Sequence, residues 1–240
     1  MSTGSRIKTF LGSKVMEIGR KIVAVGRNYE DHAREMGSKR PTVPLLFLKP
    51  TSSYIHEGSS IEIPAITKDV HHEVELGVVI GRVAKDVPMI TAMDYIAGYV
   101  LALDLTARDL QAEAKKGGLP WSVSKGFDTF TPVSKFLPRS TIPDPADVEI
   151  WCKVDGELRQ KGSTKDMIFS IPELISYASS VFTLEQGDVI LTGTPAGVGP
   201  IRPGQVINAG ITNVVEMTFP VTDRPVTNTF LYFAHNIGKQ

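Results

Sequence analysis

The sequence predicts a mixed α+β fold that consists mainly of strands. Short apolar segments recur along the 240 residues and are bounded by turn-forming residues, and the chain holds 21 glycines and 16 prolines. Candidate helices are few and scattered, and no regular alternation of strand and helix indicates a parallel α/β sheet. No internal repeat or low-complexity linker divides the chain, so we expect one large domain or at most two small ones.

The N-terminal half contains most of the predicted strands. They are apolar segments that end at glycine, proline or a charged residue: Ile22–Val25, Leu45–Leu48, Ile61–Ile63, His71–Ile80 and Tyr95–Leu103. A short helix, Tyr29–Met36, is expected to end at Gly37. A second helix is expected to begin at Thr106-Ala-Arg-Asp109, where Asp takes the place of Glu in a capping box, and to end at Gly117-Gly118.

The C-terminal half predicts a hairpin, a helix and two further strands. Asp155-Gly156 between Val148–Val154 and Glu157–Arg159 is the pattern of a two-residue β-hairpin. Pro172 is suited to the first turn of an amphipathic helix, Glu173–Phe182. The remaining segments are a strand, Asp188–Leu191, a glycine-rich loop, Thr192–Gly199, and a last strand, Val214–Phe219.

Composition excludes several classes of protein. Lys and Arg number 26 and Asp and Glu number 26, so the formal net charge is zero and the basic surface of a nucleic-acid-binding protein is not expected. No stretch free of charged residues reaches the roughly 20 residues that a membrane helix requires. The single cysteine, Cys152, excludes an intrachain disulfide and is interpreted as a packing residue.

The N-terminal segment, residues 1–21, has the composition of a mitochondrial transit peptide. It holds five basic residues, several Ser and Thr residues and one acidic residue, Glu17. A solvated terminus of a cytoplasmic protein is the alternative. An apolar secretion signal is absent from the segment, so we expect a mitochondrial or a cytoplasmic location.

Three carboxylates form a candidate metal site. Glu73 and Glu75 alternate with apolar residues in the strand His71–Ile80, which places them on one face with Cβ atoms about 6.5–7 Å apart. Asp104 ends the strand Tyr95–Leu103, which is too apolar to lie at the surface, so its charge needs a partner. An all-oxygen site favours Mg²⁺ or Mn²⁺. A solvated sheet face, or a helix-capping role for Asp104, is the alternative.

His71 leaves a zinc site open, because it shares the predicted face of Glu73. The sequence around it lacks the H-E-x-x-H pattern, and no cysteine is nearby. A structural histidine held by hydrogen bonds is therefore the favoured interpretation. No G-x-S-x-G motif indicates a serine hydrolase.

Further candidates lie in three other segments. His32 and Glu35 are spaced i, i+3 on a short helix, so the carboxylate can orient the imidazole as a base, although spacing alone favours an ordinary surface pair. Lys125 lies among apolar and small residues and can pair with Asp104, bind an anionic substrate, or simply extend to solvent. The Thr192–Gly199 loop can bind a carboxylate through its N–H groups, or form only a tight turn.

Taken together, these segments resemble the fumarylacetoacetate hydrolase family, and within it the short mitochondrial acylpyruvase and oxaloacetate decarboxylase subgroup. The matching motifs keep a consistent order between Ile22 and Phe219: Val25-Gly-Arg-Asn-Tyr-x-x-His32, Phe47-Leu-Lys-Pro50, His72-Glu-Val-Glu-Leu76, Gly98–Asp104 with Thr106-Ala-Arg-Asp109, Lys125-Gly-Phe-Asp128, and Leu191-Thr-Gly-Thr-Pro195. The tail, residues 222–240, has no counterpart, and its role stays open.

The resemblance implies a mixed β-sandwich roll with a few peripheral helices over residues 22–221, usually as a homodimer. It implies Mg²⁺, with Mn²⁺ as a substitute, held by three ligands: Glu73, Glu75 and Asp104. It implies that Lys125 is an active-site lysine and that His32 and Glu35 form a water-activating pair on a lid. It also implies three residues near the substrate: Arg27, Gln111 and Thr194.

The activities implied by the resemblance act on small 2-oxo acids. They are hydrolysis of acylpyruvates such as acetylpyruvate and fumarylpyruvate, decarboxylation of oxaloacetate, and its enol–keto tautomerisation. Two alternatives stay open: a hydratase or isomerase of aromatic catabolism, and a non-catalytic metal-binding dimeric scaffold. The His32–Glu35 pair argues against the first, and the complete set of candidate site residues argues against the second.

Overall fold

A computed structural model describes residues 18–35, 37 and 39–225. The strands are β1 Ile22–Gly26, β2 Leu45–Lys49, β3 Tyr54–Ile55, β4 Ile61–Ile63, β5 Val70–His72, β6 Val74–Ile80, β7 Ile96–Leu103, β8 Thr106–Ala107, β9 Thr131–Pro132, β10 Leu137–Pro138, β11 Glu149–Val154, β12 Glu157–Ser163, β13 Val189–Leu191, β14 Gly199–Ile201, β15 Val206–Ile211 and β16 Val215–Asp223. The α-helices are α2 Glu30–Glu35, α3 Arg108–Gly117, α4 Ser122–Lys125 and α5 Ile171–Val181. Short 3₁₀ helices span Thr51–Ser53, Met89–Tyr95, Arg139–Thr141 and Thr164–Asp166.

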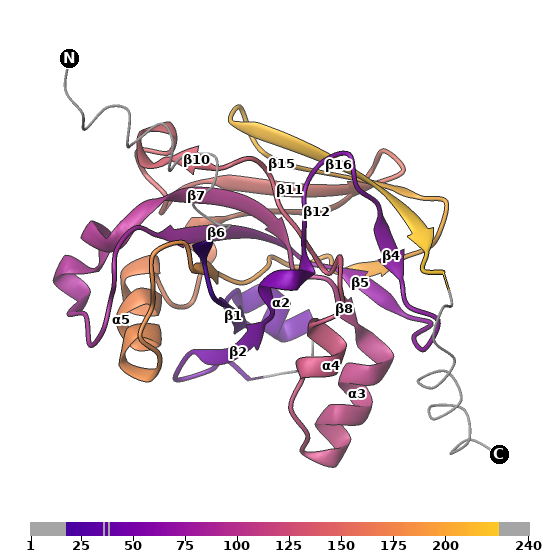
Figure 1. Ribbon diagram of the computed structural model, residues 1–240, viewed down its shortest axis with the longest axis horizontal. Coiled ribbons are helices and arrows are strands. Elements are labelled where there is room, and N and C mark those ends of the chain that lie inside the picture. The colour runs from indigo at the N-terminus through magenta and orange to yellow at the C-terminus, as the bar shows by residue number, and fades with distance from the viewer. Residues whose placement is uncertain (1–17, 36, 38, 226–240) are drawn as a thin grey trace.

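Two sheets form the body of the molecule (Figure 1). A six-stranded sheet has the order β10-β7-β6-β13-β1-β2, and a five-stranded sheet has the order β12-β11-β15-β16-β4. The larger of two buried apolar clusters includes side chains of both sheets, and the helices lie at the periphery. A three-stranded sheet, β14-β5-β8, and the pair β3-β9 complete the fold. The predicted α+β, mainly β sandwich is confirmed.

Side chains alternate between the two faces of β6, and this alternation separates core residues from Glu75. Val74, Leu76 and Val78 are buried in the larger cluster. Glu75 and Gly77 point to the opposite face of the sheet, because successive side chains of a strand alternate. Gly77 is required there, since a Cβ atom would lie 2.6 Å from a methyl group of Val100 on the neighbouring strand β7.

The predicted strand His71–Ile80 is in fact two strands that meet at Glu73. β5 pairs with β14 and β8, whereas β6 pairs with β13 and β7. The change of partners interrupts the strand at Glu73. Glu73 therefore lies at a corner between two sheets, and the prediction of one continuous strand was wrong.

The capping box predicted at Thr106 was also wrong. Thr106 belongs to β8, and α3 begins after Ala107 without a side-chain cap. The Thr106 hydroxyl instead donates to Glu73 Oε1 at 3.0 Å, and the Asp109 carboxylate accepts from the Thr67 hydroxyl at 2.6 Å. The end of the helix was predicted correctly, because Gly118 takes the left-handed conformation with φ 64°.

The predicted hairpin and the predicted C-terminal helix are confirmed. Asp155 and Gly156 join β11 to β12 with φ values of 51° and 81°, as a two-residue turn of this kind requires. Helix α5 begins after Ser170, whose N–H donates to Glu173 Oε2 at 2.7 Å. Strand β15 and helix α4 were not predicted, and β16 extends two residues into the segment expected as a tail.

Most of the predicted N-terminal segment lies outside the described residues, as does Met36 of the first predicted helix. The last two residues of the N-terminal segment contact the fold, because the N–H groups of Arg20 and Lys21 donate to Asp188 Oδ1 at 2.8 and 3.1 Å. The transit peptide stays a prediction. Among the described residues, no helix has the length and apolar character needed to cross a membrane.

Candidate active site

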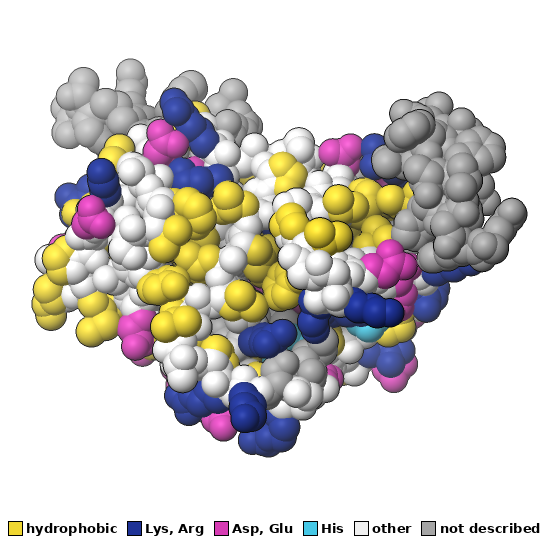
Figure 2. All heavy atoms as spheres, turned by 90° about the horizontal axis from the view of Figure 1, so that it is seen from below, with side chains coloured by type: hydrophobic (Ala, Val, Ile, Leu, Met, Phe, Trp, Pro, Cys, Tyr) yellow, Lys and Arg dark blue, Asp and Glu magenta, His cyan; other side chains and the backbone are white. Residues whose placement is uncertain are grey.

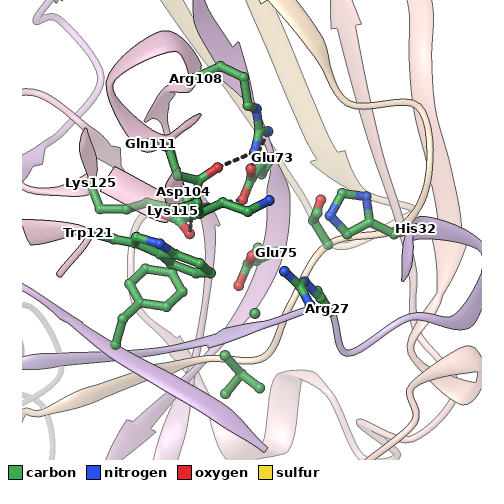
Figure 3. A pocket seen from close by; sticks show the side chains of 14 residues that line it. Arg27, His32, Glu73, Glu75, Asp104, Arg108, Gln111, Lys115, Trp121 and Lys125 are labelled. Carbon is green, nitrogen blue, oxygen red and sulfur yellow. Dashed lines mark hydrogen bonds and ion pairs between the residues drawn. The ribbon is translucent and has the colours of Figure 1, made fainter. Parts of the chain in front are cut away.

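One pocket contains eight of the nine predicted site residues (Figure 3). Its empty space is about 430 Å³, open solvent included. Its lining residues are Val25, Gly26, Arg27, His32, Phe47, Glu73, Glu75, Asp104, Arg108, Gln111, Lys115, Trp121, Lys125 and Thr194. The ninth predicted residue, Glu35, contacts His32.

The three predicted metal ligands converge, and all are buried. One carboxylate oxygen from each of Glu73, Glu75 and Asp104 lies within 4.8 Å of the other two. Glu75 and Asp104 come from neighbouring strands, because the start of β6 pairs with the end of β7. Glu73 joins them from the corner before β6, where its carbonyl accepts from the Asp104 N–H at 2.8 Å.

Neighbouring cations balance two of these carboxylates. Lys125 Nζ lies 2.9 Å from Glu73 Oε2 and 2.5 Å from Asp104 Oδ2, and Lys49 Nζ lies 2.5 Å from Asp104 Oδ1. Arg108 Nη2 lies 2.6 Å from Glu73 Oε1. Burial alone would raise the pKa of Glu73, but Lys125, Arg108 and His32 outweigh it and hold that pKa well below its usual range. Burial alone would likewise lower the pKa of Lys125, yet Asp104 and Glu73 raise it.

Within residues 18–35, 37 and 39–225, Glu75 lacks such a partner. No ion pair to Glu75 occurs in the described part of the chain, and its Oε2 accepts a hydrogen bond from the Gly193 N–H at 2.8 Å. Burial and the nearby charges of Asp104 and Glu73 raise the pKa of Glu75 well above its usual value. A buried carboxylate whose charge is not balanced fits a site for a divalent cation, and an all-oxygen donor set fits Mg²⁺ or Mn²⁺.

His32 and Glu35 form the pair that their spacing predicted. His32 is 5% exposed, and its Nδ1 lies 3.2 Å from Glu35 Oε2. When Nδ1 donates to this carboxylate, the neutral form of the imidazole has its lone pair on Nε2. Glu35 is held in turn by the Gly197 N–H, which donates to its Oε1 at 3.1 Å.

The glycine-rich loop does bind carboxylates through its N–H groups, but these carboxylates are side chains of the protein itself. Gly193 donates to Glu75, and Gly197 donates to Glu35. Gly197 has φ 94°, and a Cβ atom there would lie 2.1 Å from the Arg159 carbonyl oxygen. Only glycine fits this close approach.

The residues expected near the substrate lie on different walls of the pocket. Gln111 of α3 accepts from Arg108 Nη1 at 2.8 Å. The Thr194 hydroxyl donates to the Val74 carbonyl and accepts from Gln160 Nε2, both at 2.8 Å. Arg27 follows β1 with φ 59°, a left-handed conformation that is uncommon outside glycine.

Sequence reasoning did not place four residues in the site: Lys49, next to the pocket, and Arg108, Lys115 and Trp121 on its wall. Arg108, Gln111 and Lys115 are spaced i, i+3, i+7, so the helical period could have placed them on one face of α3. Lys49 follows an apolar strand just as Asp104 does, and the same argument for a charge partner applies. His71 contacts Asp69 at 3.1 Å, as expected of a structural histidine, and Cys152 is buried.

Comparison with known proteins shows the family of this chain. Residues 21–222 match the family model described as fumarylacetoacetate (FAA) hydrolase C-terminal. The chain is 59% identical to a protein of Arabidopsis thaliana named oxaloacetate tautomerase FAHD1, mitochondrial, over 90% of this chain and 97% of that protein. It is 57% identical to one of Dictyostelium discoideum named oxaloacetate decarboxylase, mitochondrial, over 87% and 97%.

A solved structure shares the fold. Fumarylpyruvate hydrolase from Pseudomonas aeruginosa, determined in complex with Mn²⁺ and pyruvate, matches with a TM-score of 0.81 at 36% identity, over 86% of this chain and 91% of that one. The mitochondrial location expected from the N-terminus agrees with the names of both curated relatives. The chain belongs to the fumarylacetoacetate hydrolase family, within its group of short mitochondrial members.

Proposed function

We propose that the protein is a Mg²⁺-dependent enzyme that acts on small 2-oxo acids, by hydrolysis of acylpyruvates and by tautomerisation or decarboxylation of oxaloacetate. The observation that carries the proposal is a buried cluster of three carboxylates that shares one pocket with Lys125 and the oriented His32. The relatives are named for activities of this class.

All three reactions share one electrostatic problem. Cleavage or deprotonation at C3 of a 2-oxo acid builds negative charge on the keto oxygen, as an enolate. Glu73, Glu75 and Asp104 would hold Mg²⁺, and the ion would supply positive charge that stabilises the enolate, a contribution on the order of several kcal/mol. Lys125 adds a buried positive charge to the same pocket.

The histidine distinguishes hydrolysis from decarboxylation. In hydrolysis, His32 Nε2 takes a proton from water, and the hydroxide attacks the distal carbonyl while Glu35 keeps the imidazole oriented. The C–C bond then breaks and pyruvate leaves as its enolate. Decarboxylation needs no water, because CO₂ departs and leaves the same enolate. Tautomerisation moves only a proton between C3 and the keto oxygen.

The oriented His–Glu pair favours this function over the two alternatives. An isomerase or hydratase of aromatic catabolism keeps the metal site but does not necessarily keep the His32–Glu35 pair. A non-catalytic scaffold needs neither the pair nor the buried Lys125, whose desolvation is costly.

The decisive measurement is the ultraviolet absorbance of an acylpyruvate after the purified protein is added. With Mg²⁺ present we expect the absorbance to fall, and with excess chelator we expect the loss to stop. The same assay with oxaloacetate follows its enol–keto conversion and its decarboxylation. Absence of turnover of both substrates in the presence of Mg²⁺ would contradict the proposal.

We also propose a homodimer, as the family resemblance implies. β2 is an outer strand of its sheet, and Leu45 and Leu48 on it are 37% and 43% exposed. Val123 of α4, which packs against β2, is 61% exposed, and Figure 2 shows apolar side chains gathered on the lower face of the molecule. Exposed apolar side chains at a sheet edge suit pairing with a second copy.

Light scattering is expected to give twice the mass of one chain for the wild-type protein. Leu48→Asp places a charge on the exposed edge, so the variant is expected to shift towards the monomer. A monomeric wild-type protein at micromolar concentration would contradict the dimer.

A further inference from the structure

Among the described residues, two cations of the pocket have no acidic partner. Lys125 and Arg108 are paired with the carboxylate cluster. Arg27 and Lys115 line the same pocket, yet within the described ranges neither side chain forms an ion pair or a hydrogen bond to a side chain. Their charges are available to a ligand.

The two unpaired cations come from opposite walls. Lys115 lies on the face of α3 that also carries Arg108 and Gln111, because the three are spaced i, i+3, i+7. Arg27 follows β1 in its left-handed conformation. In Figure 3 the two side chains extend towards one another across the pocket.

The electrostatics indicate an anion between them. Burial lowers the pKa of Lys115, and the charges of Arg27 and Arg108 lower it further. Like charges that converge in a concave site attract an anion and are stabilised by it. A carboxylate suits this place, since an arginine can donate two parallel hydrogen bonds to it and a lysine adds a point charge.

We propose that Lys115 and Arg27 bind the second carboxylate of a four-carbon 2-oxo dicarboxylic acid, and that this contact favours tautomerisation over decarboxylation. The inference rests on the proposed function, because it takes the first carboxylate and the keto oxygen to lie at the Glu73, Glu75 and Asp104 cluster. It assigns Lys115 as a residue that determines substrate and reaction specificity.

The preference follows from what happens to the second carboxylate, C4. In decarboxylation the C3–C4 bond breaks, its electron pair enters the enolate, and C4 leaves as uncharged CO₂. Cations that bind the C4 carboxylate stabilise the ground state more than this transition state, and so they raise the barrier. In tautomerisation a proton moves between C3 and the keto oxygen, C4 keeps its charge, and the contact persists.

The test compares two unreactive ligands that differ only at C4. Malate carries the C4 carboxylate, and lactate lacks it. By calorimetry with Mg²⁺ present, we expect the wild-type protein to bind malate at least about tenfold more tightly than lactate. Lys115→Met should lose most of that preference while its affinity for lactate is kept. Lys116→Met removes the charge of the neighbouring exposed residue and should keep the preference for malate.

The reaction itself gives a second readout. With oxaloacetate, the ratio of decarboxylation to tautomerisation should rise in Lys115→Met and stay unchanged in Lys116→Met. Equal weakening of malate and lactate, or an unchanged preference in Lys115→Met, would overturn the carboxylate site. An unchanged reaction ratio would overturn the claim about reaction preference. A wild-type protein that prefers malate but turns over no 2-oxo acid would overturn the proposed function and still support the carboxylate site.

Discussion

Glu73→Ala is expected to abolish Mg²⁺ binding and all turnover while the protein stays folded. The change removes one of three carboxylates and leaves Lys125 and Arg108 without their shared partner, so the cluster gains positive charge and repels a divalent cation. Loss of several kcal/mol of transition-state stabilisation corresponds to a rate loss of at least about 10³-fold. Calorimetry with Mg²⁺ and the acylpyruvate assay measure the two effects.

Two further variants make that result interpretable. Glu216→Ala removes an exposed carboxylate from β16, outside the pocket, and should bind Mg²⁺ normally. Glu75→Gln replaces a buried carboxylate whose pKa is raised with a neutral group of the same shape. It should therefore fold at least as stably as the metal-free wild type and still lose Mg²⁺ affinity. Normal turnover by folded Glu73→Ala would remove Glu73 from the metal site.

His32→Ala is expected to separate the activities. Removal of a general base costs about 10²–10⁴-fold in the step that needs it. Hydrolysis of acylpyruvate should fall by that factor, whereas decarboxylation of oxaloacetate, which uses no water, should fall far less. Initial rates for both substrates on the same preparation give the ratio.

An exposed histidine provides the matched control. His56→Ala changes the same residue type in an exposed loop and should leave both rates unchanged. Glu35→Gln should impair hydrolysis in the same direction as His32→Ala, because Glu35 orients the imidazole. If the His32 variant lost both activities equally, the proposed division of roles would be wrong.

The sequence predicted the parts of the site that depend on local spacing. Glu73 and Glu75 are two residues apart, His32 and Glu35 are three apart, and Asp104 ends an apolar strand, so each could be found within a short window. The break at Glu73 could not be found in this way, because it is set by the distant strands β14, β8 and β13 with which the two halves pair.

Only some of the ion pairs in the site could be predicted from the sequence. The partnership of Lys125 with Asp104 was considered, but Lys49 was not, although it also contacts Asp104. The capping box failed because Thr106 and Asp109 found partners in other elements, Glu73 and Thr67. Polar side chains in a buried region bind whichever partner the tertiary fold supplies, and local patterns cannot rank those partners.

The pairing of β6 with β7 affects how the ligand preference of this fold can change. The acidic cluster is built within and beside a single antiparallel pair whose side chains are packed on both faces. Other residues that line the pocket come from other elements, such as α3 and the turn after β1. Substitutions in those walls can change which molecule is accepted without disturbing the acidic cluster, so one cluster of this kind can serve different reactions when the residues around it differ.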